Sequence, residues 1–181
     1  IIKDNSLKFE TFINDIRDLM TIETNKLNLK IEKVDIKPVI EDIVKLLKIH
    51  ADKKNITINV EGLNNNNEIP YCYCDLEKTH RVIINLLSNA IKFTPQNGCI
   101  WLKVDVKKDH LQVCIKDNGI GIEKEELDNI FIKFYQVKNQ DVKNNGLGIG
   151  LSICKAIVEQ QKGKIWMNSQ INKGTSVFFT I

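Results

Sequence analysis

Four short segments follow one another from residue 85 onward, and each combines residue types that a simple hydrophobic core does not require. They are Asn85–Lys92 (NLLSNAIK), Asp117–Gly121 (DNGIG), Phe131–Phe134 (FIKF) and Gly146–Leu151 (GLGIGL). Any one of them could arise by chance, because short glycine-rich or asparagine-rich matches are common. All four in this order form a specific pattern, which constrains the fold and the site together.

The first segment lies on a predicted helix whose other faces are apolar. Asn85, Ser88, Asn89 and Lys92 are spaced i, i+3, i+4 and i+7, so they share one face of that helix. A buried amide without a hydrogen-bond partner costs roughly 1–3 kcal/mol, so two aligned amides need a partner. Amide oxygens suit Mg²⁺, and the lysine supplies positive charge for phosphate. The stripe predicts a metal and phosphate contact; an ordinary solvated polar face is the alternative.

The second segment follows a predicted strand, Leu111–Ile115, and places a carboxylate beside two glycines. An ionised Asp117 only accepts hydrogen bonds, so it suits an exocyclic amine such as that of adenine. Gly119 and Gly121 would permit a tight turn and let the backbone approach a flat base. The same Asp-Asn-Gly sequence is also a common turn signal.

The fourth segment has glycines at every second position, Gly146, Gly148 and Gly150, where a helix is predicted to begin. A helix N-terminus offers unpaired N–H groups and a positive dipole to phosphate. The spacing matches neither a P-loop nor the Gly-x-Gly-x-x-Gly of a dinucleotide site. The polar stretch 136–145 before it predicts a lid over the nucleotide, with Phe131 and Phe134 either anchoring the lid or packing as core aromatics.

The remaining pattern predicts a two-layer α/β (α+β) sandwich. Helices are predicted at about 5–26, from Pro38 onward, from the N-cap Asp75 to Phe93, near 123–130 and after the glycine series. Strands are predicted near 27–31, 56–60, 71–74, 100–106, 111–115, 165–167 and 177–181. The apolar stripe of the long first helix indicates a bundle or coiled-coil partner, or else packing on its own domain.

Composition excludes several classes of function. A net charge of +3 is too small to indicate a nucleic-acid groove, and no apolar run is long enough to span a bilayer. The chain opens at Ile1 without Met and without a leader pattern, so it is expected to be a piece of a longer protein.

Cysteine and histidine spacing gives no metal site. The five cysteines lack the C-x-x-C spacing of zinc or redox sites and are expected to be reduced, which favours a cytoplasmic location. None of the three histidines lies at metal spacing, and all three are expected to be functionally silent. The cysteines are Cys72, Cys74, Cys99, Cys114 and Cys154, and the histidines are His50, His80 and His110.

Taken together, the four segments resemble the N, G1, F and G2 boxes of the histidine protein kinases, and the resemblance covers nearly the whole chain. It implies a Bergerat-type ATP-binding fold with a mixed sheet, as in gyrase, Hsp90 and MutL, binding ATP or ADP with Mg²⁺. It implies that Asn89, supported by Asn85, holds the metal, that Lys92 contacts phosphate, and that these three are the catalytic residues. Asp117 would read adenine, and Thr175 would lie beside that contact. The full set of nucleotide-binding residues implied is Asn85, Asn89, Lys92, Asp117, Gly119, Gly121, Ile122, Phe134, Lys143, Gly146, Leu147, Gly148, Ile149, Gly150, Leu151 and Thr175.

One departure from the family pattern limits what this chain can do alone. The family's phosphoacceptor lies in an H box, a histidine followed by Glu or Asp and later Pro, and no such segment is present. Residues 1–30 resemble the second helix of the dimerisation hairpin that carries this box, and residues 31–181 resemble the catalytic domain. The resemblance implies a parent that is a homodimer, cytoplasmic or the cytoplasmic part of a membrane-anchored sensor. Its implied partners are its own hairpin and a receiver (response regulator) domain.

The residues leave two other interpretations open. The first is a stand-alone ATPase or serine kinase of the same fold, which leaves the hairpin-like first helix and the F box unexplained. The second is a non-enzymatic nucleotide-sensing or scaffold domain, which leaves the complete set of pocket segments unexplained. The leading hypothesis is a histidine kinase catalytic domain that does not autophosphorylate without its hairpin.

Overall fold

The computed structural model describes residues 20, 28–63, 71–137 and 147–181, and its strands form two sheets. In the larger sheet β2 and β4 are parallel and all other neighbours are antiparallel, so the sheet is mixed. In spatial order its strands are β2 (Thr57–Glu61), β4 (Cys99–Val106), β5 (Leu111–Asp117), β7 (Gly174–Thr180) and β6 (Ile165–Gln170). The smaller sheet pairs β1 (Ile31–Val34) antiparallel with β3 (Cys72–Asp75).

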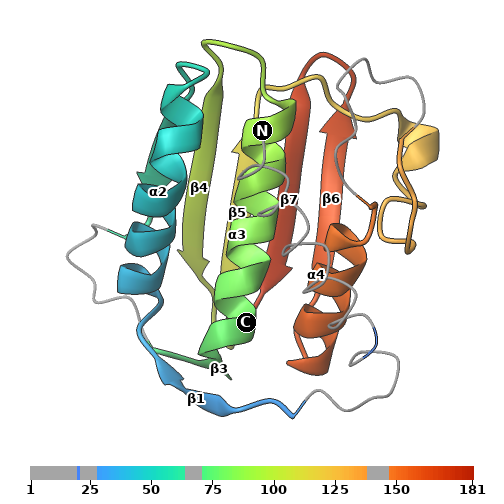
Figure 1. Ribbon diagram of the computed structural model, residues 1–181. Coiled ribbons are helices and arrows are strands. Elements are labelled where there is room, and N and C mark those ends of the chain that lie inside the picture. The colour runs from blue at the N-terminus through green and yellow to red at the C-terminus, as the bar shows by residue number, and fades with distance from the viewer. Residues whose placement is uncertain (1–19, 21–27, 64–70, 138–146) are drawn as a thin grey trace, which may run out of the picture.

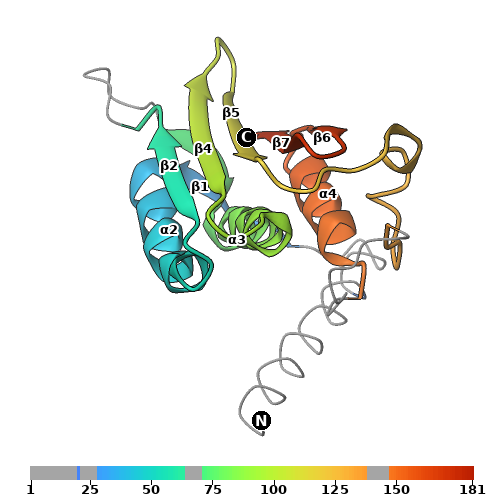
Figure 2. The same ribbon diagram turned by 90° about the horizontal axis from the view of Figure 1, so that it is seen from above.

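Three helices lie side by side on one face of the larger sheet (Figures 1 and 2). They are α2 (Ile36–Asp52), α3 (Leu76–Phe93) and α4 (Gly150–Gln160), with α3 in the middle. A single 3₁₀ turn, η1 (Lys124–Glu126), follows β5. This arrangement confirms the predicted two-layer α/β sandwich with a mixed sheet.

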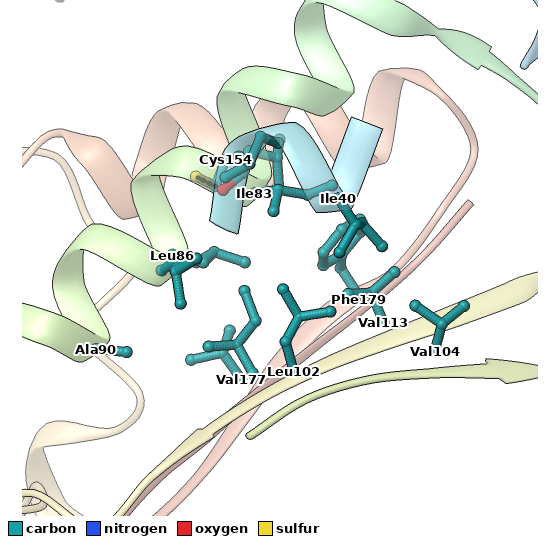
Figure 3. Close-up of a cluster of buried hydrophobic side chains, with 14 of the residues drawn as sticks. Ile40, Ile83, Leu86, Ala90, Leu102, Val104, Val113, Cys154, Val177 and Phe179 are labelled. Carbon is teal, nitrogen blue, oxygen red and sulfur yellow. Dashed lines mark hydrogen bonds between the residues drawn. The ribbon is translucent and has the colours of Figure 1, made fainter. Parts of the chain in front are cut away.

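The core lies between the two layers (Figure 3). Alternation along each strand turns one row of side chains toward the helices, and helical spacing turns a stripe of each helix toward the sheet. Each large apolar side chain that becomes fully buried contributes about 1.5–3 kcal/mol, so this interface stabilises the arrangement of the helices. Residues drawn in Figure 3 include Ile40, Ile83, Leu86, Ala90, Leu102, Val104, Val113, Cys154, Val177 and Phe179.

Asp75 fixes the start of α3 and joins it to two other segments. Its carboxylate accepts hydrogen bonds from the backbone N–H of Lys78 (3.0 Å) and of Lys30 (2.8 Å). Its own backbone N–H donates to Oε1 of Gln161, 2.6 Å away, at the end of α4. The predicted N-cap is therefore confirmed, and the same residue also ties the chain before β1 to α3 and α4.

Lys54 fixes the other end of α3. Its ammonium group donates to the carbonyl oxygens of Ile91 (2.8 Å), Lys92 (3.0 Å) and Thr94. The last carbonyls of a helix lack intrahelical partners and carry the negative end of its dipole, so a cation there is favourable. Burial lowers the pKa of Lys54 from its usual value.

Several boundaries differ from the prediction. The strand expected at 27–31 is displaced, because β1 begins only at Ile31, where pairing with β3 becomes possible. Helix α2 begins at Ile36 with Asp35 as its N-cap, so Pro38 is the third residue rather than the first. Proline is tolerated there because the first four N–H groups of a helix have no partner. The helix expected at 123–130 is reduced to η1, with bonds of the i to i−3 type continuing after it.

The predicted first helix, 5–26, lies outside the described residues apart from Met20. The division into 1–30 and 31–181 therefore stays a prediction. In the part of the chain that the structure describes, every helix is too short or too polar to cross a membrane.

Replacing Lys54 by methionine is expected to lower the free energy of unfolding by about 2 kcal/mol, because three carbonyls lose a charged donor. Urea denaturation followed by circular dichroism measures this difference. The matched control is Lys53→Met, whose side chain is exposed one residue earlier, and which should change stability by less than about 0.5 kcal/mol. Equal effects of the two substitutions would show that the contact between Lys54 and the end of α3 does not stabilise the domain.

Candidate nucleotide-binding site

A cavity of about 260 Å³ lies where α3, the start of α4 and the chain after β5 meet. It combines a few polar groups with largely apolar walls, which is usual for a small-molecule site. Its polar lining includes Asn85, Asn89, Lys92, Asp117 and Thr175, which are all predicted site residues.

The two amides of α3 are held in a fixed relation to each other. Nδ2 of Asn89 donates to Oδ1 of Asn85 at 3.2 Å, as the i, i+4 spacing allows. This bond uses the Asn89 amino group and leaves its oxygen to accept from, or to ligate, a bound group. The arrangement suits a cation that is coordinated by Asn89 and completed by phosphate and water.

Lys92 supplies positive charge one turn further along α3. Its Nζ lies 4.8 Å from the centroid of the Phe93 ring, and burial lowers its pKa from the usual value. Among the described residues no carboxylate lies within ion-pair distance of it. A half-buried ammonium group of this kind gains from an anionic ligand, since a phosphate would offset its lost hydration.

Asp117 ends β5 and is only 6% exposed. Its Oδ1 accepts from the backbone N–H of Gly119 (2.8 Å) and of Thr175 (3.2 Å). Burial raises the pKa of Asp117, and these two hydrogen bonds oppose that rise in part. Oδ2 accepts no hydrogen bond from the residues that the structure describes, yet it retains some exposure and the residue lines the cavity. One carboxylate oxygen is thus held by the backbone and the other is left for a donor.

A chain of hydroxyl groups supports Asp117 from the neighbouring strands. Ser169 Oγ lies 2.8 Å from Thr175 Oγ1, and it also accepts from the backbone N–H of Ile122 at 2.8 Å. Thr175 in turn donates its backbone N–H to Asp117. These contacts position both Thr175 and Ile122 on the cavity wall.

The start of α4 presents its backbone to the same cavity. Its N-cap, Ile149, has no side-chain acceptor, so the first N–H groups of the helix are not satisfied by a cap. A Cβ on Gly150 would lie 2.5 Å from the amide nitrogen of Asn85, so a larger residue at this contact would displace the Asn85 side chain. Gly148 has φ +71°, and a Cβ there would lie 2.5 Å from the carbonyl oxygen of Tyr135. Leu147, Gly148, Ile149, Gly150 and Leu151 all line the cavity.

Two predicted residues are not brought to the cavity. Gly119 packs against the carbonyl of Phe93, 2.5 Å from where its Cβ would be, so its part is to hold Asp117 rather than to border a base. Gly121 does line the cavity. The side chain of Phe134 is 64% exposed, because a φ of +63° turns the chain there and places Tyr135 on the wall instead. Lys143 and Gly146 lie outside the described residues.

Most of the apolar wall residues were missed by sequence reasoning. Their residues follow the same periodicity as the core, so nothing in the sequence separates a cavity wall from a filled interior. Gln136, which follows the F-box-like segment, also lines the site. The apolar and aromatic lining residues absent from the prediction are Leu86, Ala90, Phe93, Ile115, Ile120, Ile130, Tyr135, Val137, Met167 and Val177.

The donor set fits a purine nucleotide with a divalent cation. The apolar walls would cover a flat base, the Asp117 oxygen would accept from an amine, and Lys92 with the α4 N-terminus would meet phosphate. Among the described residues no cluster of three His, Cys, Asp or Glu side chains could hold a metal alone. A cation at Asn89 would therefore need ligands besides these side chains, and phosphate oxygens and water are suitable ones.

The family model for histidine kinase-, DNA gyrase B- and HSP90-like ATPases matches residues 74–181. The chain belongs to this ATPase family. The non-motile and phage-resistance protein of Caulobacter vibrioides is 36% identical over 174 residues, which is 93% of this chain and 20% of that protein. The adaptive-response sensory kinase SasA of Prochlorococcus marinus is 36% identical over 142 residues, 78% of this chain and 37% of that kinase. The chain thus spans well under half the length of these relatives.

Solved structures of the ATPase family agree with the fold. The catalytic domain of histidine kinase ThkA superposes with a TM-score of 0.73 at 29% identity, covering 84% of this chain and 95% of ThkA's. ThkA in complex with the response regulator protein TrrA gives a TM-score of 0.70 at 26% identity, covering 93% of this chain and 48% of that one. These matches place the domain among the ATP-binding catalytic domains of sensor histidine kinases, as predicted.

Asp117→Asn is expected to change how the stability of the nucleotide-free domain depends on pH. Because burial raises the native pKa of Asp117 above its usual value, ionisation of this carboxyl destabilises the folded state. The cost is present above the raised pKa and is lost as the pH falls through it. The stability of the variant relative to the parent should therefore be greater at pH 7 than at pH 4, as measured by urea denaturation.

The exposed Asp128 provides the control for this pH series. Asp128→Asn should leave the free energy of unfolding within about 0.5 kcal/mol of the parent at both pH values. A relative stability of Asp117→Asn that increased toward pH 4 would have the wrong sign and would contradict the effect of burial.

Proposed function

We propose that this domain binds ATP or ADP together with Mg²⁺ and presents the γ-phosphoryl group of ATP to a histidine on a dimerisation hairpin. The observation that carries the proposal is the content of one cavity. A backbone-held carboxylate with one open oxygen, a pair of amides, a half-buried lysine and an uncapped helix start all line it.

Each polar group has a role in the proposal. Asp117 accepts from the adenine amine and disfavours guanine, whose carbonyl would face the carboxylate. Asn89 holds Mg²⁺ with Asn85 supporting it, and Lys92 with the first turn of α4 neutralises phosphate charge. Transfer of this kind depends on positioning and electrostatic stabilisation, because the transition state needs little covalent help from the protein.

The partners belong to the proposal as well. Residues 1–30 would form the second helix of the dimerisation hairpin, and 31–181 the catalytic domain. The parent would be a cytoplasmic homodimer or the cytoplasmic part of a membrane sensor, a location that the five unbridged cysteines support. A response regulator would receive the phosphoryl group; the ThkA–TrrA complex, formed by a related kinase, supports this class of partner.

Mg²⁺ is expected to strengthen ADP binding, and Asn89→Ala is expected to remove most of that gain. Removing a metal ligand leaves one coordination position to water, so a loss of about tenfold in Mg²⁺-dependent affinity is expected, or roughly 1.4 kcal/mol. Isothermal titration calorimetry with ADP, with and without Mg²⁺, measures both quantities.

Two controls accompany this titration. Asn168→Ala removes an exposed amide on β6 and should leave both affinities unchanged. GDP should compete poorly with ADP, since Asp117 offers no donor to the guanine carbonyl. A Mg²⁺ effect that survives in Asn89→Ala would take Asn89 out of the metal site, and equal binding of GDP would remove the adenine contact.

The isolated chain is expected not to label itself with γ-phosphate-labelled ATP, and to phosphorylate a histidine when a polypeptide carrying its dimerisation hairpin is added. Transfer needs the acceptor nitrogen in line and about 3–3.5 Å from the phosphorus, which requires the hairpin. The product should be acid-labile and alkali-stable, as resolved by gel autoradiography after each treatment.

The control for this assay is a variant in which His50, His80 and His110 are all replaced by glutamine. It should label the added hairpin as well as the parent does, because none of these residues lines the cavity. Acid-stable label on the isolated chain that persists in the triple variant would contradict histidine transfer and would favour the serine-kinase alternative.

A further inference from the structure

Strand β3 carries two cysteines whose sulfur atoms touch. Because side chains alternate along a strand, Cys72 and Cys74 point to one side while Tyr71 and Tyr73 are exposed on the other. Cys72 is 6% exposed and Cys74 is fully buried. Their Sγ atoms are 3.7 Å apart, and both thiols are unbridged. The pair lies at the opposite end of α3 from Lys92 and plays no part in the nucleotide site.

The two thiols have different environments. The hydrogen bond from Cys72 lowers the pKa of Cys74 to about 7, assisted by the Thr79 hydroxyl and opposed by burial and the carboxylates of Asp75 and Glu32. The same contact with Cys74 raises the pKa of Cys72, as do burial and the charge of Asp35, while a bond to its backbone opposes the rise. Cys74 therefore ionises first, beside a second thiol that stays protonated. A thiolate next to a resolving thiol is the arrangement found in oxidation-sensitive cysteine pairs.

The strand that carries the pair belongs to the smaller sheet. β1 and β3 form a separate two-stranded sheet with only four residues in each strand. Two-stranded ribbons are marginally stable and open locally more easily than a large sheet does. Local opening would admit a small oxidant to sulfur atoms that are buried in the closed state.

We propose that Cys72 and Cys74 form a dithiol site that hydroperoxides oxidise to an intramolecular disulfide. In the first step the Cys74 thiolate attacks one peroxide oxygen, the O–O bond breaks, and Cys74 becomes a sulfenic acid as hydroxide leaves. In the second step the sulfur of Cys72 attacks the sulfenic sulfur, and the S–O bond breaks. The released hydroxide takes up the Cys72 proton. With hydrogen peroxide the sum is two thiols plus one peroxide giving one disulfide and two waters.

Closure of this disulfide changes the backbone. Residues i and i+2 of an extended strand have Cα atoms about 6.4–6.8 Å apart, at the upper end of the range that a disulfide spans. The bond therefore shortens β3 and weakens its register with β1, in which Glu32 lies opposite Cys74 and Val34 opposite Cys72.

The experiment treats the full 181-residue chain with hydrogen peroxide, blocks remaining thiols with N-ethylmaleimide and maps peptides by mass spectrometry. The peptide that contains both cysteines should lose the mass of two hydrogen atoms, take up no maleimide, and recover on reduction with dithiothreitol. The rate should rise between pH 6 and pH 8, because the fraction of thiolate, the reacting form, increases over this range.

Single substitutions separate the two roles. In Cys72→Ser the sulfenic acid on Cys74 has no resolving thiol and should be trapped by dimedone, whereas Cys74→Ser should give no dimedone adduct on Cys72. Cys99→Ser/Cys114→Ser, which removes the two half-buried thiols, should still form the disulfide. If either single variant fails to fold, the mass of the parent peptide still decides. Oxidation of Cys99 or Cys114 while the 72–74 peptide keeps both thiols would overturn the proposal, as would disulfides only between molecules.

Discussion

The contact between α3 and the first turn of α4 determines the phosphate end of the pocket. Gly150 lies so close to the Asn85 amide that any side chain at this position would have to displace that amide. The same amide pairs with Asn89. The Asn85–Asn89 amide pair and an uncapped helix start, distant in the sequence, are therefore brought to one place by the sheet that supports both helices. Neither group alone would bind phosphate and metal together; their juxtaposition is what the fold contributes.

Both ends of α3 are fixed by groups outside the helix, and these contacts hold its polar stripe in one position relative to the rest of the domain. Asp75 caps the first turn, and Lys54 reaches the carbonyls of the last. The pocket also holds groups that are costly in the free protein, since burial disfavours the charged forms of both Asp117 and Lys92. Burying these two ionisable groups lowers the free energy of unfolding of the ligand-free domain. The hydrogen bonds at the two ends of α3 act in the opposite direction.

Local signals made much of the site predictable from sequence. The polar stripe of α3 and its N-cap depend on spacings of a few residues, which a sequence displays directly. β1 was misplaced because the apolar alternation of Leu27, Leu29 and Ile31 stops at Ile31, whereas the strand begins there and is defined by its pairing with the distant β3. Phe134 lies outside the cavity lining because the folded chain sets a left-handed backbone conformation there, and its part in nucleotide binding stays a prediction.

Long-range contacts left no readable signal. Two lysines in succession, Lys53 and Lys54, look alike in the sequence, and only the packing of α2 beside α3 shows which one reaches the helix end. The cavity walls were hard to predict for the same reason. A wall residue has the same sequence pattern as a core residue, and differs only in that no side chain packs against it from the opposite side. Contact between the sulfur atoms of Cys72 and Cys74 was likewise hidden, although their spacing on one strand could have indicated a shared face.

Asp75 connects the chain that enters β1 to both helices of the pocket. This one residue is hydrogen-bonded to three segments: Lys30, the first turn of α3, and Gln161 at the end of α4. A twist of the chain at Lys30 therefore acts on both pocket helices at once, at the ends remote from the phosphates. Rotation of α4 against α3 would change the contact at Gly150, where the backbone of α4 lies directly against the amide side chain of Asn85. The chain that enters β1 is thus connected, through the hydrogen bonds of one buried residue, to both helices that line the cavity.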